Sequence, residues 1–377
     1  MKVALVHNLP HGGARRVLAE HAVRLGCETV ELCLATAVPV GADATVVPCA
    51  PLAPRVAPVL RPPLRYADLG MLLVAWRRVA AALRTSGADV VLAHPCQFLQ
   101  APAALLWTGL PTIYFCHEPR RVDHDPTARL TRNPRTRGLY GPLHRAERAV
   151  DRRATGAAGR LVTNSRFTAG RIRAAYGREA TPLPLGVPDR FGPPASRPED
   201  GGHVLSVGAL IPTKGHDLVV EAAALAGTRR RVLVVAPRAD PGEERRLRAL
   251  ARERGVDLDV RTEISDDDLC TAYQQAFATL YLARDEPFGL ASLEAQACGS
   301  PVVVADEGGL PETIDPGVTG WAVPREPAAA AACLDRLEDP ATRAAFAQRA
   351  AARGAGCSWA RSAAAMVAVL EQEAARA

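Results

Sequence analysis

The chain has 377 residues, of which 48% are hydrophobic and 23% are charged, and its formal net charge is only +6. This length favours two domains with a core each, and the composition excludes disordered, collagen-like and coiled-coil proteins. No stretch approaches the roughly 18 uncharged apolar residues of a membrane span, because Arg77 and Arg78 interrupt the best candidate, residues 64–83. The N-terminus lacks the apolar region of a signal peptide, and the nine cysteines include no C-x-x-C pair. We therefore expect a cytoplasmic protein without disulfides or zinc.

Basic residues concentrate in the first half of the chain. Residues 1–190 hold 26 Lys and Arg against 13 Asp and Glu, so this half carries +13 and the remainder carries −7. The surplus is densest over residues 120–178 and would suit nucleic acid, an anionic membrane or an acidic substrate. The competing explanation is a coding bias, because 44 of the 46 basic residues are arginines and only Lys2 and Lys214 are lysines.

Short apolar runs alternate with helix-length segments through the first half. The predicted strands are 3–7, 29–34, 45–47, 89–93, 112–115 and 161–163. The predicted helices are 14–25, 68–85, 97–107, 136–155 and 165–176. Apolar strands separated by helices indicate a parallel sheet that is covered on both faces.

A proline-rich stretch at 182–198 interrupts this alternation, which then restarts. Strands are predicted at 203–207, 231–235, 258–261, 279–282 and 301–305, and helices at 215–226, 242–254, 266–276 and 289–298. Ser358 is a suitable N-cap for a last helix. We therefore predict an N-terminal Rossmann-like domain over 1–185, a linker over 186–202, a C-terminal Rossmann-like domain over 203–357 and a final helix over 358–377. Ligands of such sheets bind beyond the carboxyl ends of the strands, and two facing domains would form a central cleft.

The sharpest cluster of chemistry-bearing residues is Glu286-Pro-Phe-Gly-Leu-Ala-Ser-Leu-Glu294, which follows a predicted strand and opens a helix. Pro287 suits the first turn of a helix, and Gly289 permits close approach to the backbone. The N–H groups of Phe288, Gly289 and Leu290 would then point out of the helix N-terminus, where phosphate binds well. The structural alternative is an ordinary helix start with Glu286 as a favourable first-turn charge.

A second cluster, Val207-Gly-Ala-Leu-Ile-Pro-Thr-Lys-Gly215, connects a strand to a helix. It lacks the G-x-x-x-x-G-K-[ST] pattern of a P-loop. Lys214 nevertheless stands at a strand-to-helix turn, which suits a phosphate ligand. A solvated loop lysine is the alternative, although its rarity in this arginine-rich chain favours a function.

Two further candidates follow strands in the first half. Gly12 and Gly13 lie in the first strand-to-helix turn, where they could bring backbone amides close to a phosphate or sugar or form an ordinary tight turn. The absence of G-x-G-x-x-G there speaks against a dinucleotide-binding dehydrogenase. His117 follows the run 112–115 directly, at a strand's carboxyl end, although a lone histidine is more often structural.

Taken in order, these elements resemble the GT-B retaining glycosyltransferases of family four, the E-x7-E type. The likeness rests on the Gly-Gly loop after the first strand, the His in the first domain, the hinge, the V-G…K-G loop, E-x7-E, and the later G-x-P-V-V and Gly308-Gly309-Leu-Pro-Glu312 elements. It implies that Lys214 contacts the donor diphosphate, that Glu286 holds donor-sugar hydroxyls and that Glu294 holds the ribose. It also implies that the amides of Phe288, Gly289 and Leu290 meet the distal phosphate and sugar, that His117 lies against the transferred sugar and that Gly12 and Gly13 admit the diphosphate. Lys214, His117 and Glu286 would be the catalytic residues.

The resemblance further implies a same-face substitution without a metal or other cofactor. The departing phosphate becomes more negative as the sugar–oxygen bond breaks, and fixed donors such as Lys214 and the helix N-terminus stabilise that charge. One departure stands out. Family members commonly carry an Arg shortly after the V-G strand, where this chain has Ala209 and Leu210, so Arg284 or a first-domain residue would have to replace it.

Four readings of the function follow from these residues. We expect a transferase that moves a sugar from a UDP- or GDP-linked donor to a hydroxyl of a small-molecule, glycan or lipid-linked acceptor. The alternatives are a nucleotide-sugar epimerase or hydrolase on the same fold, a silent GT-B partner subunit, and a protein that binds nucleic acid or an anionic membrane. The last reading leaves the E-x7-E and K-G elements unexplained, so we expect no nucleic-acid partner. Peripheral contact with the inner face of a membrane, for example through Trp76 and its neighbouring arginines, competes with a core helix over 64–83.

Overall fold

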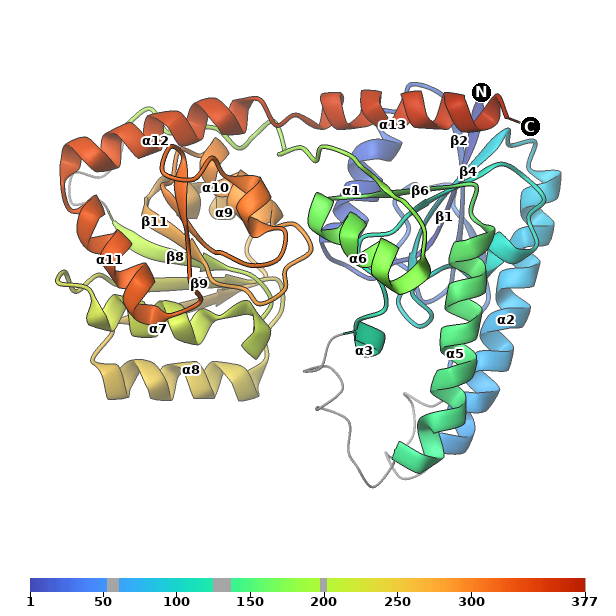
Figure 1. Ribbon diagram of the computed structural model, residues 1–377, viewed down its shortest axis with the longest axis horizontal. Helices are drawn as coiled ribbons and strands as arrows, with labels where there is room; N and C mark the ends of the chain where they lie inside the picture. The colour runs from blue at the N-terminus through green and yellow to red at the C-terminus, as the bar shows by residue number, and fades with distance from the viewer. Residues whose placement is uncertain (53–60, 125–136, 197–201, 377) are drawn as a thin grey trace. The chain divides into compact units, whose positions relative to one another are not determined.

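The computed structural model describes residues 1–52, 61–124, 137–196 and 202–376. The chain divides into two units, which we call unit 1 (Met1–Pro184 with Ser362–Ala377) and unit 2 (Leu185–Arg361). Residues 197–201 of the predicted linker lie outside the described residues, and its earlier part from 186 on is counted with unit 2. Each unit is built around one parallel sheet with helices packed against it (Figure 1). The predicted fold class of two parallel-sheet, Rossmann-like domains is therefore confirmed.

Unit 1 contains a seven-stranded sheet in the order β3-β2-β1-β4-β5-β6-β7, with parallel pairing throughout. Its strands are β1 (Lys2–Asn8), β2 (Glu28–Leu34), β3 (Thr45–Val47), β4 (Val90–Cys96), β5 (Thr112–Phe115), β6 (Arg160–Thr163) and β7 (Thr181–Pro182). Leu5 in the middle of β1 lies opposite Glu31 of β2 and Leu92 of β4. The strand order reverses between β1 and β4, and the carboxyl ends at such a switch point are where open sheets bind ligands.

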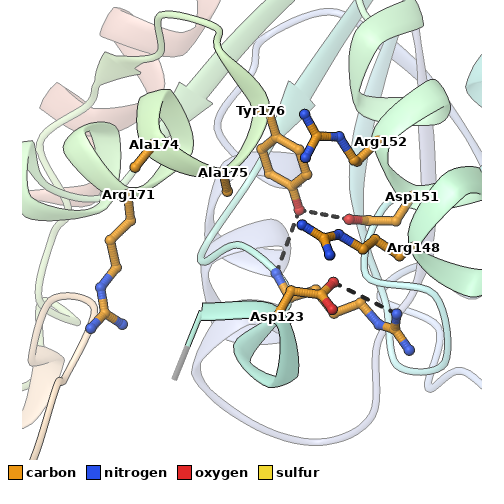
Figure 2. A pocket seen from close by; sticks show the side chains of 9 residues that line it. Asp123, Arg148, Asp151, Arg152, Arg171, Ala174, Ala175 and Tyr176 are labelled. Atoms are coloured by element: carbon orange, nitrogen blue, oxygen red, sulfur yellow. Dashed lines mark hydrogen bonds and ion pairs between the residues drawn. The ribbon is translucent and has the colours of Figure 1, made fainter. Parts of the chain in front are cut away.

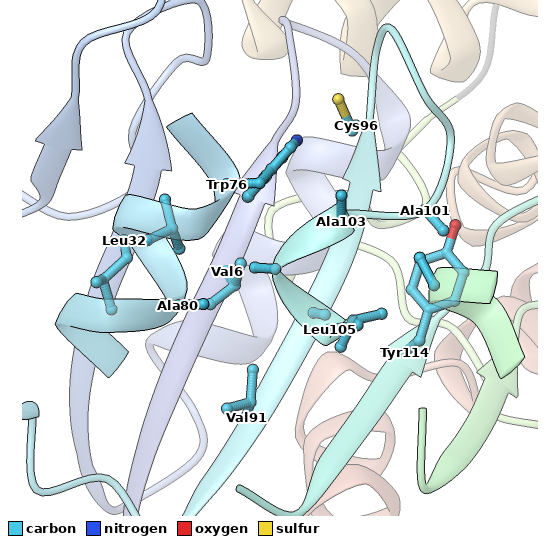
Figure 3. Close-up of a cluster of buried hydrophobic side chains, with 14 of the residues drawn as sticks. Val6, Leu32, Trp76, Ala80, Val91, Cys96, Ala101, Ala103, Leu105 and Tyr114 are labelled. Atoms are coloured by element: carbon cyan, nitrogen blue, oxygen red, sulfur yellow. The ribbon is translucent and has the colours of Figure 1, made fainter. Parts of the chain in front are cut away.

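The helices of unit 1 cover both faces of this sheet. They are α1 (Gly13–Ala22), α2 (Arg61–Thr85), α3 (Arg121–His124), α5 (Arg137–Ala157) and α6 (Arg166–Tyr176). Figure 1 shows α2 and α5 running side by side. Trp76 of α2 is fully buried and packs with Val6, Leu32 and Val91 in the core cluster drawn in Figure 3. The apolar stretch 64–83 is therefore a core helix, and Trp76 offers no surface to a membrane.

The helix predicted over 97–107 is wrong. Only a short 3₁₀ helix, η3 (Ala103–Leu106), is present there. Cys96 and Gln100 exchange backbone hydrogen bonds of 2.7 and 2.8 Å, and Gln100 has a left-handed φ of 68°. A right-handed helix requires negative φ, so the tight turn at Gln100 replaces the first half of the predicted helix.

Unit 2 contains a six-stranded parallel sheet in the order β10-β9-β8-β11-β12-β13. The strands are β8 (His203–Val207), β9 (Val232–Ala236), β10 (Leu258–Thr262), β11 (Ala276–Tyr281), β12 (Val302–Ala305) and β13 (Gly320–Val323). The helices are α7 (His216–Leu225), α8 (Pro241–Arg254), α9 (Asp266–Gln274), α10 (Leu290–Ala297), α11 (Pro327–Leu337) and α12 (Pro340–Ala355). The chain order again reverses beside the first strand, between β8 and β11, so the loops after these two strands share one switch point.

The last helix, α13 (Trp359–Ala374), begins in unit 2 and continues in unit 1. Ser358 accepts a hydrogen bond from the Arg361 N–H at 3.2 Å, as expected of an N-cap. Further along, Ser362 is hydrogen-bonded to His21 at 2.8 Å, and Glu373 pairs with Arg160 at 3.7 Å. The end of the chain is thus part of unit 1.

No helix within the described ranges is both long enough and apolar enough to cross a membrane. All nine cysteines have free thiols. The cytoplasmic location stays a prediction.

Candidate active site

Lys214 and Glu286 meet in unit 2 although 72 residues separate them in the chain. Lys214 ends the short helix η5 (Pro212–Lys214), and its Nζ lies 2.6 Å from Glu286 Oε2. The ammonium also donates to the Tyr281 hydroxyl at 3.2 Å and lies 5.6 Å from the centroid of that ring. The two side chains of the ion pair are 20% and 15% exposed, so a ligand can still reach them.

The charge state of Lys214 follows from these neighbours. Burial alone would lower the pKa of its ammonium, but Tyr281 and Glu286 more than compensate, so the pKa lies above its usual value. Burial likewise raises the pKa of the Tyr281 hydroxyl, with Glu286 adding to the effect. Lys214 is therefore a permanent cation and Tyr281 a neutral hydroxyl at neutral pH.

Glycines allow the loops around this pair to fit together. Gly215 has a φ of 73°, and a Cβ there would lie 2.2 Å from the Leu282 carbonyl oxygen. A Cβ at Gly309 would lie 2.3 Å from the Pro287 oxygen, and the Gly309 N–H donates to the Glu286 carbonyl at 2.7 Å. The Gly308-Gly309 turn after β12 thus packs directly against the backbone of the loop that carries Glu286. This close packing leaves no room for a side chain at Gly309.

The N-terminus of α10 presents free backbone donors near Glu286. Gly289 is its N-cap with a φ of 110° and has no side chain to cap this end. The structure records no acceptor for the N–H groups of Phe288, Gly289 and Leu290 among the described residues. As predicted from the sequence, a helix starts here, and its dipole and free donors suit an anion.

Glu294 lies deeper in α10 than the other predicted site residues. It is 4% exposed, and its Oε2 accepts a hydrogen bond from the Tyr273 hydroxyl at 3.0 Å. Tyr273 is itself fully buried. Glu294 is therefore fixed in place, on the same helix whose start lies beside Glu286.

In unit 1, His117 follows β5 and is almost enclosed. Its Nε2 lies 3.2 Å from Nδ1 of His94, its ring stacks on Phe115 at 4.4 Å, and its carbonyl accepts from Asn164 at 3.2 Å. Burial, and to a lesser degree His21, lowers the pKa of His117 to about 3. The imidazole is therefore neutral at neutral pH and acts as a hydrogen-bonding group rather than as a charged acid.

Gly12 and Gly13 open α1 at the carboxyl end of β1. Gly12 is the N-cap, with a φ of 150° and no side-chain hydrogen bond. Among the described residues, no atom lies within 4 Å of a Cβ placed on Gly12. The carboxyl ends of β1 and of β5, which precede Gly12 and His117, lie at the same edge of the unit 1 sheet.

At the position of the family's arginine this chain has Ala209, whose carbonyl accepts hydrogen bonds from the His216 ring at 3.1 Å and from the Ile211 N–H at 2.8 Å. Two arginines lie near the Lys214 loop instead. Arg284 donates its backbone N–H to the Thr213 carbonyl at 2.7 Å, and Arg325 donates Nε to the Leu282 carbonyl at 2.9 Å. Burial and the charge of Arg284 both lower the pKa of Arg325. Arg325 was not among the predicted site residues, because it stands two residues after β13, a strand that was not predicted either.

One group of potential metal ligands occurs within the described ranges, formed by His7, Glu31 and Cys33. Glu31 already accepts hydrogen bonds from the His7 ring at 2.8 Å and from the N–H groups of Val40 and Gly41 at 2.9 and 2.7 Å. Burial and the nearby Glu31 raise the pKa of the Cys33 thiol to about 11, which opposes the thiolate that a metal needs. These contacts fit an anchor for the loop after β2 better than a metal site.

Unit 2 therefore brings Lys214 into direct contact with Glu286 and places Phe288, Gly289, Leu290 and Glu294 along the helix that follows. Unit 1 separately holds Gly12, Gly13 and His117. Tyr281 and His94, which touch Lys214 and His117, were not predicted. Tyr281 is one of several apolar strand residues in the sequence, and nothing in its spacing distinguishes it.

Two family models match the chain and together leave little of it uncovered. The one described as "Glycosyltransferase Family 4" matches residues 11–190, and the one described as "Glycosyl transferases group 1" matches residues 192–353. The boundary between the two matches falls within the predicted linker.

Curated relatives carry one recurrent name. The D-inositol 3-phosphate glycosyltransferase of Acidothermus cellulolyticus is 37% identical over 54% of this chain and 51% of its own length. D-inositol 3-phosphate glycosyltransferase 1 of Catenulispora acidiphila is 30% identical over 79% of this chain and 76% of its own length. The chain thus spans about half of the first relative and three quarters of the second.

Solved structures share the fold across the whole chain. Sucrose-phosphate synthase of Thermosynechococcus elongatus has a TM-score of 0.77 at 19% identity and is covered completely, as is this chain. HepE of Anabaena in complex with UDP has a TM-score of 0.74 at 17% identity, over 99% of this chain and 100% of that one. These identities establish the fold, while the relatives and the family models establish the descent. The chain belongs to glycosyltransferase family 4 and has the GT-B fold.

Proposed function

We propose that this protein is a retaining, metal-independent glycosyltransferase that moves a sugar from a nucleoside diphosphate sugar to an acceptor hydroxyl. The observation that carries the proposal is the Lys214–Glu286 pair beside the uncapped N-terminus of α10. A fixed cation and free backbone donors together suit a diphosphate. The carboxylate next to them suits the hydroxyls of the attached sugar.

Lys214 can bind the diphosphate without leaving Glu286. An ammonium has three donors, of which Glu286 and Tyr281 each take one. The third has no recorded partner among the described residues. Directed at the leaving phosphate, this donor and the amides of Phe288, Gly289 and Leu290 stabilise the negative charge that grows as the sugar departs. We propose that this charge balance needs no metal, and that Arg284 or Arg325, which both contact the loops around Lys214, replaces the cation missing at Ala209.

We propose a retaining reaction on two grounds: the family resemblance, and the partners that the carboxylates of Glu286 and Glu294 already have. Glu286 is paired with Lys214 and Glu294 with Tyr273, so neither stands as the second member of a glycosidase-type pair. We propose that the leaving phosphate itself takes the proton of the acceptor hydroxyl on the same face of the sugar. His117, neutral and buried, would contact the transferred sugar as a hydrogen-bonding group.

The names of similar proteins guide the choice of substrates. HepE of Anabaena is described in complex with UDP and with UDP-glucose, and several relatives are named for D-inositol 3-phosphate. We therefore favour UDP as the donor nucleotide and place phosphorylated polyols among the first acceptors to examine.

The deciding experiment measures nucleotide release from UDP-, GDP-, ADP- and dTDP-sugars with and without phosphorylated polyols. We expect one donor to be cleaved, with EDTA without effect and with the anomeric configuration of the product retained in its NMR spectrum. Lys214→Ala should lower turnover by roughly 100-fold, the scale of losing one preorganised charge contact. Lys2→Ala, which removes the only other lysine and its exposed pair with Glu28, is the matched control.

The same samples test the second candidate, a silent partner subunit, which the alanine at position 209 favours. A loss below about threefold in Lys214→Ala would remove this residue from the mechanism. Failure of every nucleotide sugar to bind in a thermal-shift assay would favour the silent subunit, whereas binding without release would mean that the acceptor is obligatory.

A further inference from the structure

Unit 1 contains a cavity of about 240 Å³ that none of the site residues above line. It lies among α3, α5 and α6, and four of its nine lining residues are arginines, namely Arg120, Arg148, Arg152 and Arg171. Figure 2 shows Arg148 and Arg152 extending from α5 toward Tyr176 at the end of α6. Arg120 follows His117 by three residues, so the cavity opens just beyond the carboxyl end of β5.

The buried polar groups of this cavity already have partners. Asp151 accepts from the Ala101 N–H at 2.9 Å and from the Tyr176 hydroxyl at 2.8 Å. The Tyr176 hydroxyl also accepts from the Arg120 N–H at 3.4 Å. Burial raises the pKa of Asp151 to about 6, so this carboxyl is still mainly ionised at neutral pH and loses its charge below about pH 6. These hydrogen bonds hold Asp151 and Tyr176 in place, so the two side chains form part of the cavity wall and are not free to bind a ligand.

The cationic groups of the cavity divide into two kinds. Arg120 is committed, because its guanidinium bonds to Glu147 and lies 3.7 Å from Asp123. Arg171 lies over the Phe167 ring at 4.5 Å and has further contacts. Arg148 and Arg152, by contrast, have no recorded ion pair or hydrogen bond within the described ranges. Four residues apart on α5, they lie on the same face of that helix.

Two unpaired guanidinium groups on one wall of a cavity are a site for an anion. We propose that Arg148 and Arg152 bind a phosphate monoester carried by the acceptor, in the cavity beside Tyr176. A guanidinium group can donate two parallel hydrogen bonds to two oxygens of one phosphate, whereas a lysine ammonium acts as a point charge. The volume is below the roughly 300–1,000 Å³ of sites that enclose a whole ligand, so it fits a charged group while the rest of the acceptor extends outside. That the phosphate belongs to the acceptor rests on the proposed function, whereas the anion site itself does not depend on it.

The test is binding of phosphate by the full chain without any nucleotide sugar. Inorganic phosphate and glycerol 3-phosphate are titrated by calorimetry at constant ionic strength into the wild type, Arg148→Gln, Arg152→Gln and the control Arg153→Gln. Arg153 lies on the same helix and is exposed, as Arg148 and Arg152 are, but it does not line the cavity. Each cavity variant should weaken binding about tenfold or more, as expected for the loss of one charge-assisted contact, and Arg153→Gln should bind like the wild type.

Equal affinities in all four proteins, or an equal loss in Arg153→Gln, would overturn the proposal in favour of a general basic surface. Phosphatidylcholine vesicles with and without phosphatidic acid identify the source of the phosphate. Binding to phosphatidic acid that depends on Arg148 and Arg152 supports a lipid-linked acceptor, and binding of only the water-soluble probes supports a soluble one. Phosphate binding in a chain that cleaves no nucleotide sugar would keep the site and refute the proposed function, so the two failures are distinguishable.

Discussion

At the scale of single residues, Lys214 is held by Glu286 and Tyr281, of which one supplies a charge and the other a neutral hydrogen-bond acceptor. Glu286 neutralises the ammonium of Lys214. The Tyr281 hydroxyl accepts a second hydrogen bond from this ammonium, which lies 5.6 Å from the centroid of the Tyr281 ring. Tyr281 is 5% exposed at the end of β11, so it cannot itself move with a substrate. We infer that it aims the third donor of Lys214.

Tyr281→Phe tests this orienting role, because it removes the hydroxyl and keeps the ring. Lys214 retains Glu286 and its charge, so we expect donor binding to be nearly unchanged and turnover to fall about tenfold, the scale of one hydrogen bond to a charged group. Steady-state measurement of nucleotide release separates kcat from KM. Tyr66→Phe, with an exposed side chain in unit 1, is the control. A rise in KM with kcat intact would instead make Tyr281 a binding residue.

His94 orients His117, much as Tyr281 orients Lys214. His94 is fully buried, and its Nε2 has no partner among the described residues. Orphaned N–H donors are rarer in proteins than orphaned acceptors, so we infer that this Nε2 carries no proton. His94 Nδ1–H then donates to Nε2 of His117, which leaves the proton of His117 on Nδ1.

This tautomer is directly measurable. Two-bond ¹H–¹⁵N spectra of the wild type and of His117→Gln identify the His117 ring, and we expect an Nδ1–H form. Because burial lowers the pKa of His117 to about 3, its signals should not titrate between about pH 5 and 8. An Nε2–H signal, or a midpoint near pH 6.5, would contradict the arrangement.

At the scale of elements, the site of unit 2 depends on loops that pack backbone against backbone. Gly309 has a φ of −87°, which any residue adopts, so only space requires a glycine there. The atoms that a Cβ would meet, the Pro287 oxygen at 2.3 Å and the Phe288 Cα at 3.0 Å, are backbone and cannot rotate away. The loop after β12 thereby fixes the start of α10.

Gly309→Ala should displace the loop of Glu286 and reduce nucleotide release at least tenfold, with a loss of about 1–3 kcal/mol in stability from overpacking. Gly170→Ala is the matched control, since its Cβ would meet nothing within 4 Å on α6, and it should be neutral or stabilising. Activity and melting temperature are measured on the same samples. Wild-type activity in Gly309→Ala would show that the loop is not rigid.

The sequence revealed the elements whose signals are local. Strand and helix alternation, the proline and glycines around Glu286, and Ser358 as a cap all depend on neighbours in the chain. Contacts such as Lys214 with Tyr281 form only after β8 and β11 pair, so no spacing announces them. The segment 97–107 was misread because its apolar residues have helical spacing while Gln100 turns the chain. Helices α11 and α12 were not predicted, although each buries one face that includes alanines.

At the scale of the whole molecule, buried histidines are unevenly distributed between the units. Burial lowers the pKa of His21 and of His216 to about 4, that of His117 to about 3 and that of His94 well below its usual value. Three of these four lie in unit 1, and only His216 lies in unit 2. The folded chain keeps all four neutral, whereas the unfolded chain protonates them near pH 6.5.

Stability should therefore fall as the pH drops below about 6.5, because the unfolded state then binds more protons than the folded state. Each such histidine costs about 1.4 kcal/mol per pH unit until its folded pKa is reached. Asp151 acts in the opposite direction, since its raised pKa of about 6 lets the folded state bind a proton first, and it offsets about one histidine of unit 1. Calorimetry of the full chain between about pH 7 and pH 5 should show a falling melting temperature, with His11→Gln, an exposed histidine, behaving like the wild type. A melting temperature that stays constant over this range would mean that the buried histidines are charged or hydrated in the folded protein, and the neutral state assigned to His117 would fall with it.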